Sequence, residues 1–300
     1  MKRYIIILIT LGLAWALMAD VHPEAGNYGY QFLNIPINPV SMALAGRGIH
    51  YDSNHGDWLW QPASAAVNRD KSLSASHSAW IGDTAYSSLV YSNSTRAAHF
   101  GLGLTNLSYG EIEKRDETGL LIGHYNPSDL NVRGNYALRL APSLYLGANL
   151  GVIYEKLDTA SSLALSSDLG TTWLLPVEGS RMSLAVRNLG LSNKTDEIRE
   201  ELPLSLDLDL YKKLSLGEQE LGLEASVIKA VDEDLRFALS TELQFLQRLY
   251  LRAGYKFNTD AESFSAGLGL KLFRISIDYG FAAFSEGLSD VHSFGLSYQF

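Results

Sequence analysis

The densest group of potential metal ligands lies in residues 50–57. This stretch contains His50, His55 and Asp57, whose imidazole and carboxylate groups are ligands that a divalent cation could use. An EF-hand calcium loop needs glycine at its sixth position, and Gly56 does not fit that spacing. We therefore interpret the stretch as a polar turn and predict no metal site.

A nucleophilic catalytic site is also not expected. His292 and Ser293 are adjacent, and adjacent residues of a strand point to opposite faces, so they cannot pair with each other. His77 and His99 could each meet a partner across strands, but no carboxylate is in a position to orient them as a triad requires. The chain has no cysteine, which excludes a thiol nucleophile, a thiolate metal site and a lipidated N-terminal cysteine. We predict no catalytic residues, no cofactor and no enzyme activity.

The charge balance argues against a nucleic-acid partner. The 300 residues include 24 Lys and Arg against 33 Asp and Glu, a formal charge of -9. Neutralising phosphates requires clustered basic residues, and the sequence has no such cluster. The mean hydropathy is close to zero (-0.01), as expected when an apolar face and a polar face alternate along strands.

The first nineteen residues have the features of an export signal. Lys2 and Arg3 precede an apolar run at 4–17, and small residues for cleavage occur at Ala14-Trp15-Ala16 and Ala19. The alternative is a membrane anchor, but the run is short for a helix that must cross about 30 Å of hydrocarbon. We predict a signal peptide at 1–19.

The rest of the chain alternates with period two, which indicates strands. At the C-terminus Phe294, Leu296, Tyr298 and Phe300 alternate with small or polar residues. A helix would instead repeat its apolar residues every three or four positions. The expected strands lie near 72–80, 84–92, 97–108, 129–141, 143–156, 163–176, 180–189, 202–213, 219–230, 235–245, 248–258, 262–272, 274–284 and 291–300.

These strands favour a transmembrane antiparallel β-barrel of about fourteen strands over residues 72–300. Strands of roughly 9–11 residues can cross a bilayer when tilted, whereas the strands of a β-sandwich, the soluble alternative, are about half as long. Tyr298 and Phe300 are predicted to form a C-terminal insertion signal for the barrel-assembly machinery. The residues expected to face the lumen are Arg139, Asp207, Asp209, Arg236, Arg252, Lys256, Lys271, Arg274 and Asp278.

Residues 20–71 lack the alternation and are predicted to form a plug, or hatch, in the barrel. Phe32 begins an extended segment that ends at Pro36, and Trp60 precedes Pro62, which suits the first turn of a short helix. Another helical turn is expected at 40–46. A disordered tail is the alternative, but the several aromatic residues disfavour it.

The chain resembles the PorV/PorQ family, which shares the barrel architecture of FadL-like transporters, and PorQ is the nearer of the two. Gln61 departs from the asparagine of the family's Trp-Asn-Pro-Ala segment. The resemblance is carried by residues 32–36, 43–48, 60–63, 136–137, 146–150, 168–170, 187–190, 252–255, 265–269, 278–279 and 292–294, and by 116–119 and 125–129 in the long loop.

This resemblance implies a place in the outer membrane of a diderm bacterium, in contact with its lipid. It further implies a component of a type IX secretion or surface-attachment complex, with a PorZ-like surface protein as partner. The alternative function is FadL-like transport of hydrophobic small molecules. The expected lumen face is charged, and no separate apolar pocket can be recognised in the sequence.

Overall fold

The computed structural model describes residues 22–68, 71–95, 97–195 and 198–300. The predicted signal peptide at 1–19 lies outside the described residues. Among the residues described, no helix is long and apolar enough to cross a membrane.

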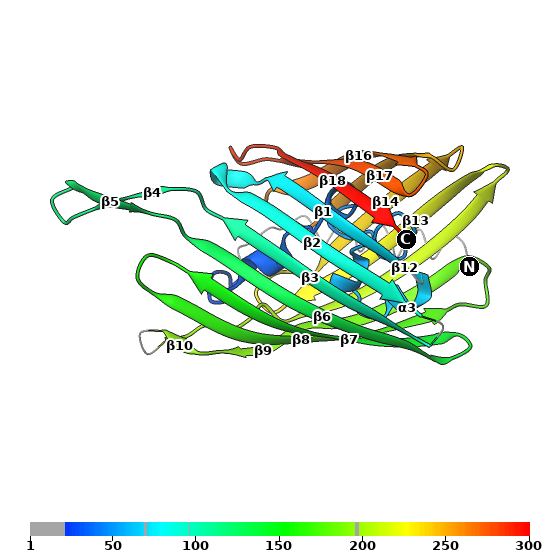
Figure 1. Ribbon diagram of the computed structural model, residues 1–300, viewed down its shortest axis with the longest axis horizontal. Helices are drawn as coiled ribbons and strands as arrows, with labels where there is room; N and C mark the ends of the chain where they lie inside the picture. Colours follow the sequence, from blue (N-terminus) through cyan, green and yellow to red (C-terminus); the bar gives the residue numbers. More distant parts are fainter. Residues whose placement is uncertain (1–21, 69–70, 96, 196–197) are drawn as a thin grey trace.

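Fourteen antiparallel strands form one closed barrel (Figure 1). The ring is sealed by the first and last strands, where Ser72 pairs with Gln299 and Ala79 with His292. This confirms the predicted fold class and strand number. The barrel strands are β1 (Lys71–Ala79), β2 (Ala85–Ser94), β3 (Ala98–Ser108), β6 (Ser128–Ala141), β7 (Leu144–Lys156), β8 (Ser161–Leu174), β9 (Ser180–Ser192), β12 (Ser205–Leu216), β13 (Gln219–Ala230), β14 (Arg236–Phe245), β15 (Leu249–Phe257), β16 (Glu262–Leu272), β17 (Ile275–Phe284) and β18 (Val291–Gln299).

The two faces of the wall differ in chemistry, as the alternation requires. In β12 the side chains of Leu206, Leu208 and Leu210 are exposed on the outside, whereas Asp207 and Asp209 between them are fully buried inside. Because outer-membrane barrels carry an apolar outer belt around a polar interior, the protein belongs in the outer membrane.

The two rims of the barrel are unequal. Turns of a few residues, such as 142–143, 217–218 and 273–274, lie at the rim where the chain ends. Longer connections lie at the other rim. One of them contains a two-stranded sheet of β10 (Lys194–Thr195) and β11 (Ile198–Arg199). Outer-membrane barrels have short periplasmic turns and longer extracellular loops, which assigns the long connections to the cell surface.

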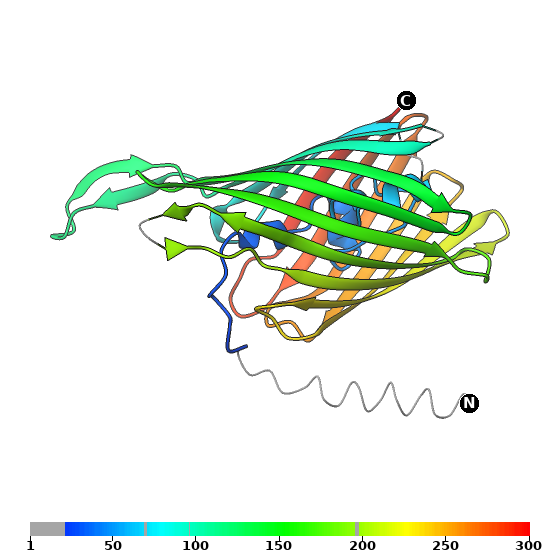
Figure 2. The same ribbon diagram turned by 90° about the horizontal axis from the view of Figure 1, so that it is seen from below.

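The long connection between β3 and β6 is not only a loop. It contains a hairpin of β4 (Ile112–Arg115) and β5 (Leu121–Tyr125) that projects beyond the barrel (Figures 1 and 2). Asp116 organises its turn by accepting hydrogen bonds from the backbone of Thr118 and Leu120, both at 2.9 Å. The hydrogen bond from the Thr118 side chain, with those from the backbone, lowers the pKa of the Asp116 carboxyl. The hairpin depends on the hydrogen bonds of its turn and not on an alternation of apolar and polar residues. The search for alternating strands therefore did not predict it.

Residues 30–68 fold inside the barrel, whereas 22–29 extend away from it (Figure 2). Residues 30–68 contain η1 (Gln31–Asn34), α2 (Pro39–Ala43), η2 (Asp57–Leu59) and α3 (Ser64–Asn68), whereas η3 (Ile81–Asp83) lies in the connection after β1. α2 begins with Pro39 in its first turn, and Asn38 caps it by accepting a hydrogen bond from Ser41 N at 2.8 Å. The helices α2 and α3 thus lie close to the helical turn expected at 40–46 and to the short helix expected after Pro62.

Candidate functional site: the plugged barrel interior

We call the segment 22–68 the plug, and its backbone touches the wall where the wall lacks side chains. A Cβ added to Gly147 of β7 would lie 2.2 Å from the carbonyl oxygen of Pro62, and one added to Gly280 of β17 would lie 2.4 Å from that of Pro39. Neither distance is possible for real atoms. Glycine at these wall positions is therefore what allows the plug backbone to approach so closely.

The four predicted plug residues are all buried between plug and wall. Phe32 belongs to an apolar cluster, and the Pro62 carbonyl accepts a hydrogen bond from Asn135 Nδ2 at 3.1 Å. Trp60 is covered by two guanidinium groups, with the Arg187 carbon 4.1 Å and the Arg47 carbon 5.5 Å from the ring centroid. Cation–π contacts of this kind gain strength when water is excluded.

An ionic network at the centre joins the plug to β9 and β12. Arg47 of the plug donates to Asp207 and Asp209, each at 2.8 Å, and Arg187 Nε donates to Asp207 at 2.6 Å. All four side chains are at most 4% exposed. Burial opposes the charge, but the attraction of Asp209 and Asp207 outweighs it and raises the pKa of Arg47. The two cations and two anions thus satisfy one another inside the barrel.

A second network joins β14, β15, β17 and the plug. Arg252 of β15 donates to Glu242 of β14 and to Asp278 of β17, each at 2.7 Å. Ser53 of the plug also donates to Glu242. Nearer the long-loop rim, Lys256 pairs with Glu262 at 2.5 Å. Charges of opposite sign are therefore paired within the lumen rather than left to face an open pore.

A third network includes residues that the sequence analysis did not assign to the lumen. Arg133 of β6 donates to Asp168 of β8 at 2.9 Å and to the plug carbonyl of Leu59 at 3.3 Å. Arg133 and Asp168 lie on the buried, polar face of strands that were predicted, so the alternation itself was the available signal. Arg47 had no such signal, because it lies in an irregular segment.

Three of the residues expected in the lumen lie at the short-turn rim. Arg139 is exposed and donates to the carbonyls of Ala141 and Pro142, at 3.2 and 2.5 Å. Arg274 is exposed in the turn after β16, and Lys271 is half-buried beside that turn. Their positions in the alternation are those of lumen-facing residues. Arg274, however, lies in a turn outside the strands, and Arg139 lies near the end of β6, beyond the last residue that pairs with β3. Alternation along a strand indicates which face of the wall a side chain is on, but not how far along the barrel axis it lies. The prediction that Arg139 and Arg274 face the lumen is corrected for this reason.

Arg236 lies at the opposite rim, half-buried and paired with Glu233. The remaining expected lumen residues are Asp207, Asp209, Arg252, Lys256 and Asp278, which take part in the networks above.

The His-rich stretch 50–57 is used for packing. His50 is fully buried, with Nε2 2.5 Å from Ser183 Oγ, and burial lowers its pKa well below the ordinary value, so the ring is neutral. Within the described part of the chain, no group of three or more His, Cys, Asp or Glu residues is arranged to hold a metal. His292 bonds Tyr279 and Ser293 bonds Ser78, on opposite faces of β18.

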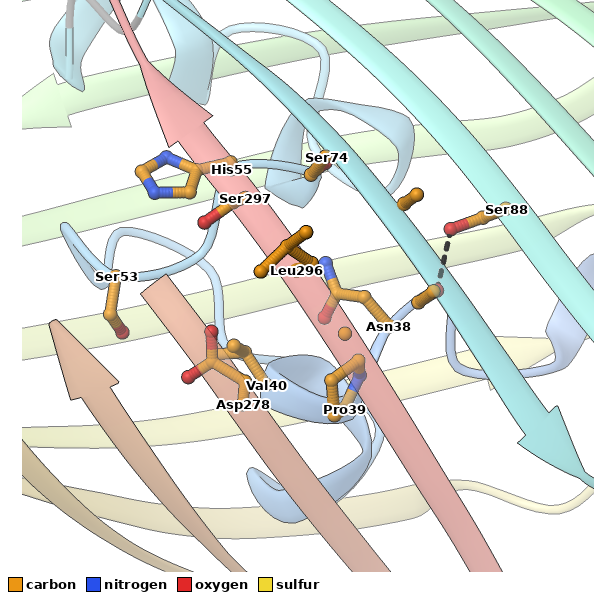
Figure 3. A pocket seen from close by; sticks show the side chains of 13 residues that line it. Asn38, Pro39, Val40, Ser53, His55, Ser74, Ser88, Asp278, Leu296 and Ser297 are labelled. Carbon is orange, nitrogen blue, oxygen red and sulfur yellow. Dashed lines mark hydrogen bonds between the residues drawn. The ribbon is translucent and has the colours of Figure 1, made fainter. Parts of the chain in front are cut away.

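Two cavities between the described plug and the wall are small. One, near α2, holds about 20 Å³ and is lined by polar groups that include Asn38, Ser297 and Asp278 (Figure 3). Another, of about 40 Å³, lies between Arg47 and Lys256. Such volumes admit a few water molecules at most, so a larger solute can use these spaces only if the plug moves.

One apolar cluster of the interior lies towards the long-loop rim, and others lie deeper, such as the one that contains Ile49, Trp58 and Leu59. In the rim cluster, Tyr30, Phe32 and Leu33 of the plug pack against Leu107 and Ile153, which lie near the surface ends of β3 and β7. Trp80 of the β1–β2 connection packs against the same cluster. This rim cluster thus lies on the surface side of the charged networks.

Comparison with known proteins shows a shared fold. No family model matches the sequence. The structure is similar to the CymD monoaromatic hydrocarbon channel (TM-score 0.63, 12% identity, covering 89% of this chain and 98% of that one). It is also similar to the Pseudomonas putida toluene transporter TodX (TM-score 0.64, 12% identity, 88% and 98% covered) and to a Pseudomonas aeruginosa FadL homologue (TM-score 0.59, 11% identity, 88% and 98% covered).

One curated protein shares local sequence similarity. The UvrABC system protein A of Pseudomonas putida is 26% identical over 155 residues, which is 50% of this chain. The chain spans only 16% of that protein's length, and this similarity identifies no family.

Proposed function

We propose that the protein passes small hydrophobic molecules across the outer membrane, with the plug as its gate. The observation that carries this proposal is the apolar cluster of Tyr30, Phe32 and Leu33 at the surface end of the barrel, with further apolar clusters deeper in the interior. A hydrophobic solute can exchange with such side chains at little cost, because both are apolar. The names of the channels with this fold, CymD and TodX, support the same class of solute.

The test is uptake by intact diderm cells that lack their own hydrocarbon channel. Expression of the protein should raise the initial uptake of labelled toluene several-fold over an empty vector, while uptake of a labelled sugar stays unchanged. Equal toluene uptake with and without the protein would contradict the proposal. A rise in both solutes would also contradict it, because that result describes an open aqueous pore.

A second candidate function is a role in a type IX secretion or surface-attachment complex with a PorZ-like partner. It is favoured by the projecting β4–β5 hairpin, whose tip exposes Leu120 (66%) and Ile122 (55%). Apolar residues exposed on a projecting element are typical of protein-binding sites.

This second function predicts that the tip of the hairpin binds a surface protein. A tagged protein carrying Leu120→Asp and Ile122→Asp should lose a partner that the unmodified protein recovers from outer membranes. Leu288→Asp, at another exposed apolar residue of a surface loop, is the matched control and should retain that partner. Recovery of no reproducible partner by the unmodified protein would remove this candidate.

We infer two further partners, the barrel-assembly machinery and the membrane lipid, because they are common to outer-membrane barrels. Tyr298 and Phe300 are exposed at the end of β18, with ring centroids 5.3 Å apart. This pair is the feature that we expect the barrel-assembly machinery to bind, and the apolar belt is the surface that contacts lipid.

A further inference from the structure

The outer face of the barrel has a hollow of about 630 Å³ over β12 to β16. Its floor is formed by Ala225, Thr241 and Ala253, and large side chains such as Tyr255 and Phe264 form its sides. The register explains the hollow, since the small Thr241 and Ala253 lie directly opposite each other on neighbouring strands. The adjoining row places Tyr255 opposite Phe264. Small residues beside large ones leave a depression in the belt.

The hollow does not open into the lumen. Pairing across β13, β14 and β15 is continuous at this height, with Leu223 opposite Thr241 and Thr241 opposite Ala253. On the inner side of the same wall, a Cβ at Gly254 would lie 2.4 Å from the Ala45 nitrogen of the plug. A molecule in the hollow therefore remains outside the wall, against the bilayer.

The chemistry of the hollow suits a hydrocarbon chain. Its volume falls in the range of about 300–1,000 Å³ that is usual for small-molecule sites. The one hydroxyl of the floor, on Thr241, already donates to the Gly222 carbonyl at 3.1 Å. A chain lying on the floor would therefore leave no new polar group without a partner.

A cation lies at one end of the hollow. Lys212 of β12 also lines it, and its ammonium group donates to the carbonyl of Glu178 in the β8–β9 turn. That turn belongs to the short-turn rim, which is periplasmic in outer-membrane barrels. Long lysine side chains reach from an apolar surface to the level of the lipid headgroups in this way. The hollow thus combines an apolar floor with a positive charge at the periplasmic interface.

We propose that the hollow binds one glycerophospholipid of the periplasmic leaflet. An acyl chain lies over Thr241 and Ala253, and the phosphate pairs with Lys212. A plain hydrocarbon would use the floor but not the cation, whereas a phospholipid uses both. This site is separate from the passage through the lumen, so it does not depend on the proposed transport.

The experiment is native mass spectrometry of the full barrel, released from mild detergent micelles that contain phosphatidylglycerol. The unmodified protein should retain one phosphatidylglycerol. Ala253→Phe fills the hollow and should abolish retention. Ala148→Phe is its control, because Ala148 lies between the exposed Tyr136 and Leu169 on another part of the wall. Heat-dependent gel mobility verifies that each variant is folded.

The cation is tested by a milder change. Lys212→Gln should weaken retention about fivefold, the effect of one basic residue near an anionic lipid surface. Lys229→Gln is the control, since Lys229 faces outward on β13 and bonds the Glu233 carbonyl at the opposite rim. Equal retention by Ala253→Phe and Ala148→Phe, or by the two lysine variants, would overturn the proposal. Binding of added toluene in the hollow with no phosphatidylglycerol retained would overturn it as well.

Discussion

Arg47 is the residue that most directly holds the plug in the barrel. It reaches from an irregular segment to two aspartates of β12, and its ring partner Trp60 lies beside it. The aspartates were predictable, because alternation assigns Asp207 and Asp209 to the polar face. Arg47 was not, since a residue outside regular structure has no periodic neighbours that indicate its face. Its partners lie about 160 positions away in sequence, and local patterns contain no information on such contacts.

Replacement of Arg47 should therefore loosen the plug. Arg47→Met leaves Asp209 buried without its cation, and breaking a buried pair from one side costs about 3–5 kcal/mol. We expect a lower urea midpoint and faster proteolysis within residues 22–68. Lys114→Met is the control, because the Lys114–Asp158 pair is exposed and such pairs contribute at most about 1 kcal/mol. Similar behaviour of both variants would show that Arg47 does not anchor the plug.

At the scale of elements, the strands could be predicted and the plug contacts could not. Every barrel strand lies within a few residues of its expected position, because the two-residue period of side chains is a local property of the sequence. The hairpin of β4 and β5 and the helices of the plug are short and depend on turns and caps. The plug helices are placed by wall positions that lack a side chain, such as Gly147. The sequence does not show the role of such a glycine, because the Pro62 backbone that approaches it is far away in the chain.

The glycines of the wall that touch the plug backbone lead to a prediction about stability. Gly147→Ala adds a methyl group where the Pro62 backbone lies, so the plug must shift, and overpacking of this kind costs about 1–3 kcal/mol. Gly134→Ala is the matched control, because the nearest atom to its added Cβ is 4.0 Å away. Urea unfolding should separate the two variants, with only Gly147→Ala destabilised. Equal midpoints would mean that the wall and plug are not in close contact there.

At the scale of the whole molecule, the protein is an outer-membrane barrel whose interior is closed by its own N-terminal segment. The sequence predicted the barrel, since alternation and strand length are properties of each segment. It did not predict that the lumen would be filled by paired charges and by apolar clusters of plug and wall, because that arrangement requires the plug and fourteen strands together. The same limit applies to function, as the secretion role came from scattered motifs and the transport role is supported by the assembled interior.

The most direct test of the gated barrel is to fix the plug to the wall and measure uptake. Ala45 of the plug donates through its backbone nitrogen to Ser265 Oγ of β16 at 3.1 Å, and the chain has no native cysteine. Because the two residues lie side by side, we expect Ala45→Cys with Ser265→Cys to form a single disulfide, with each single variant as a control. If the account is correct, toluene uptake falls to the empty-vector level under oxidation and returns on reduction. Undiminished uptake through the oxidised, fully cross-linked protein would contradict it.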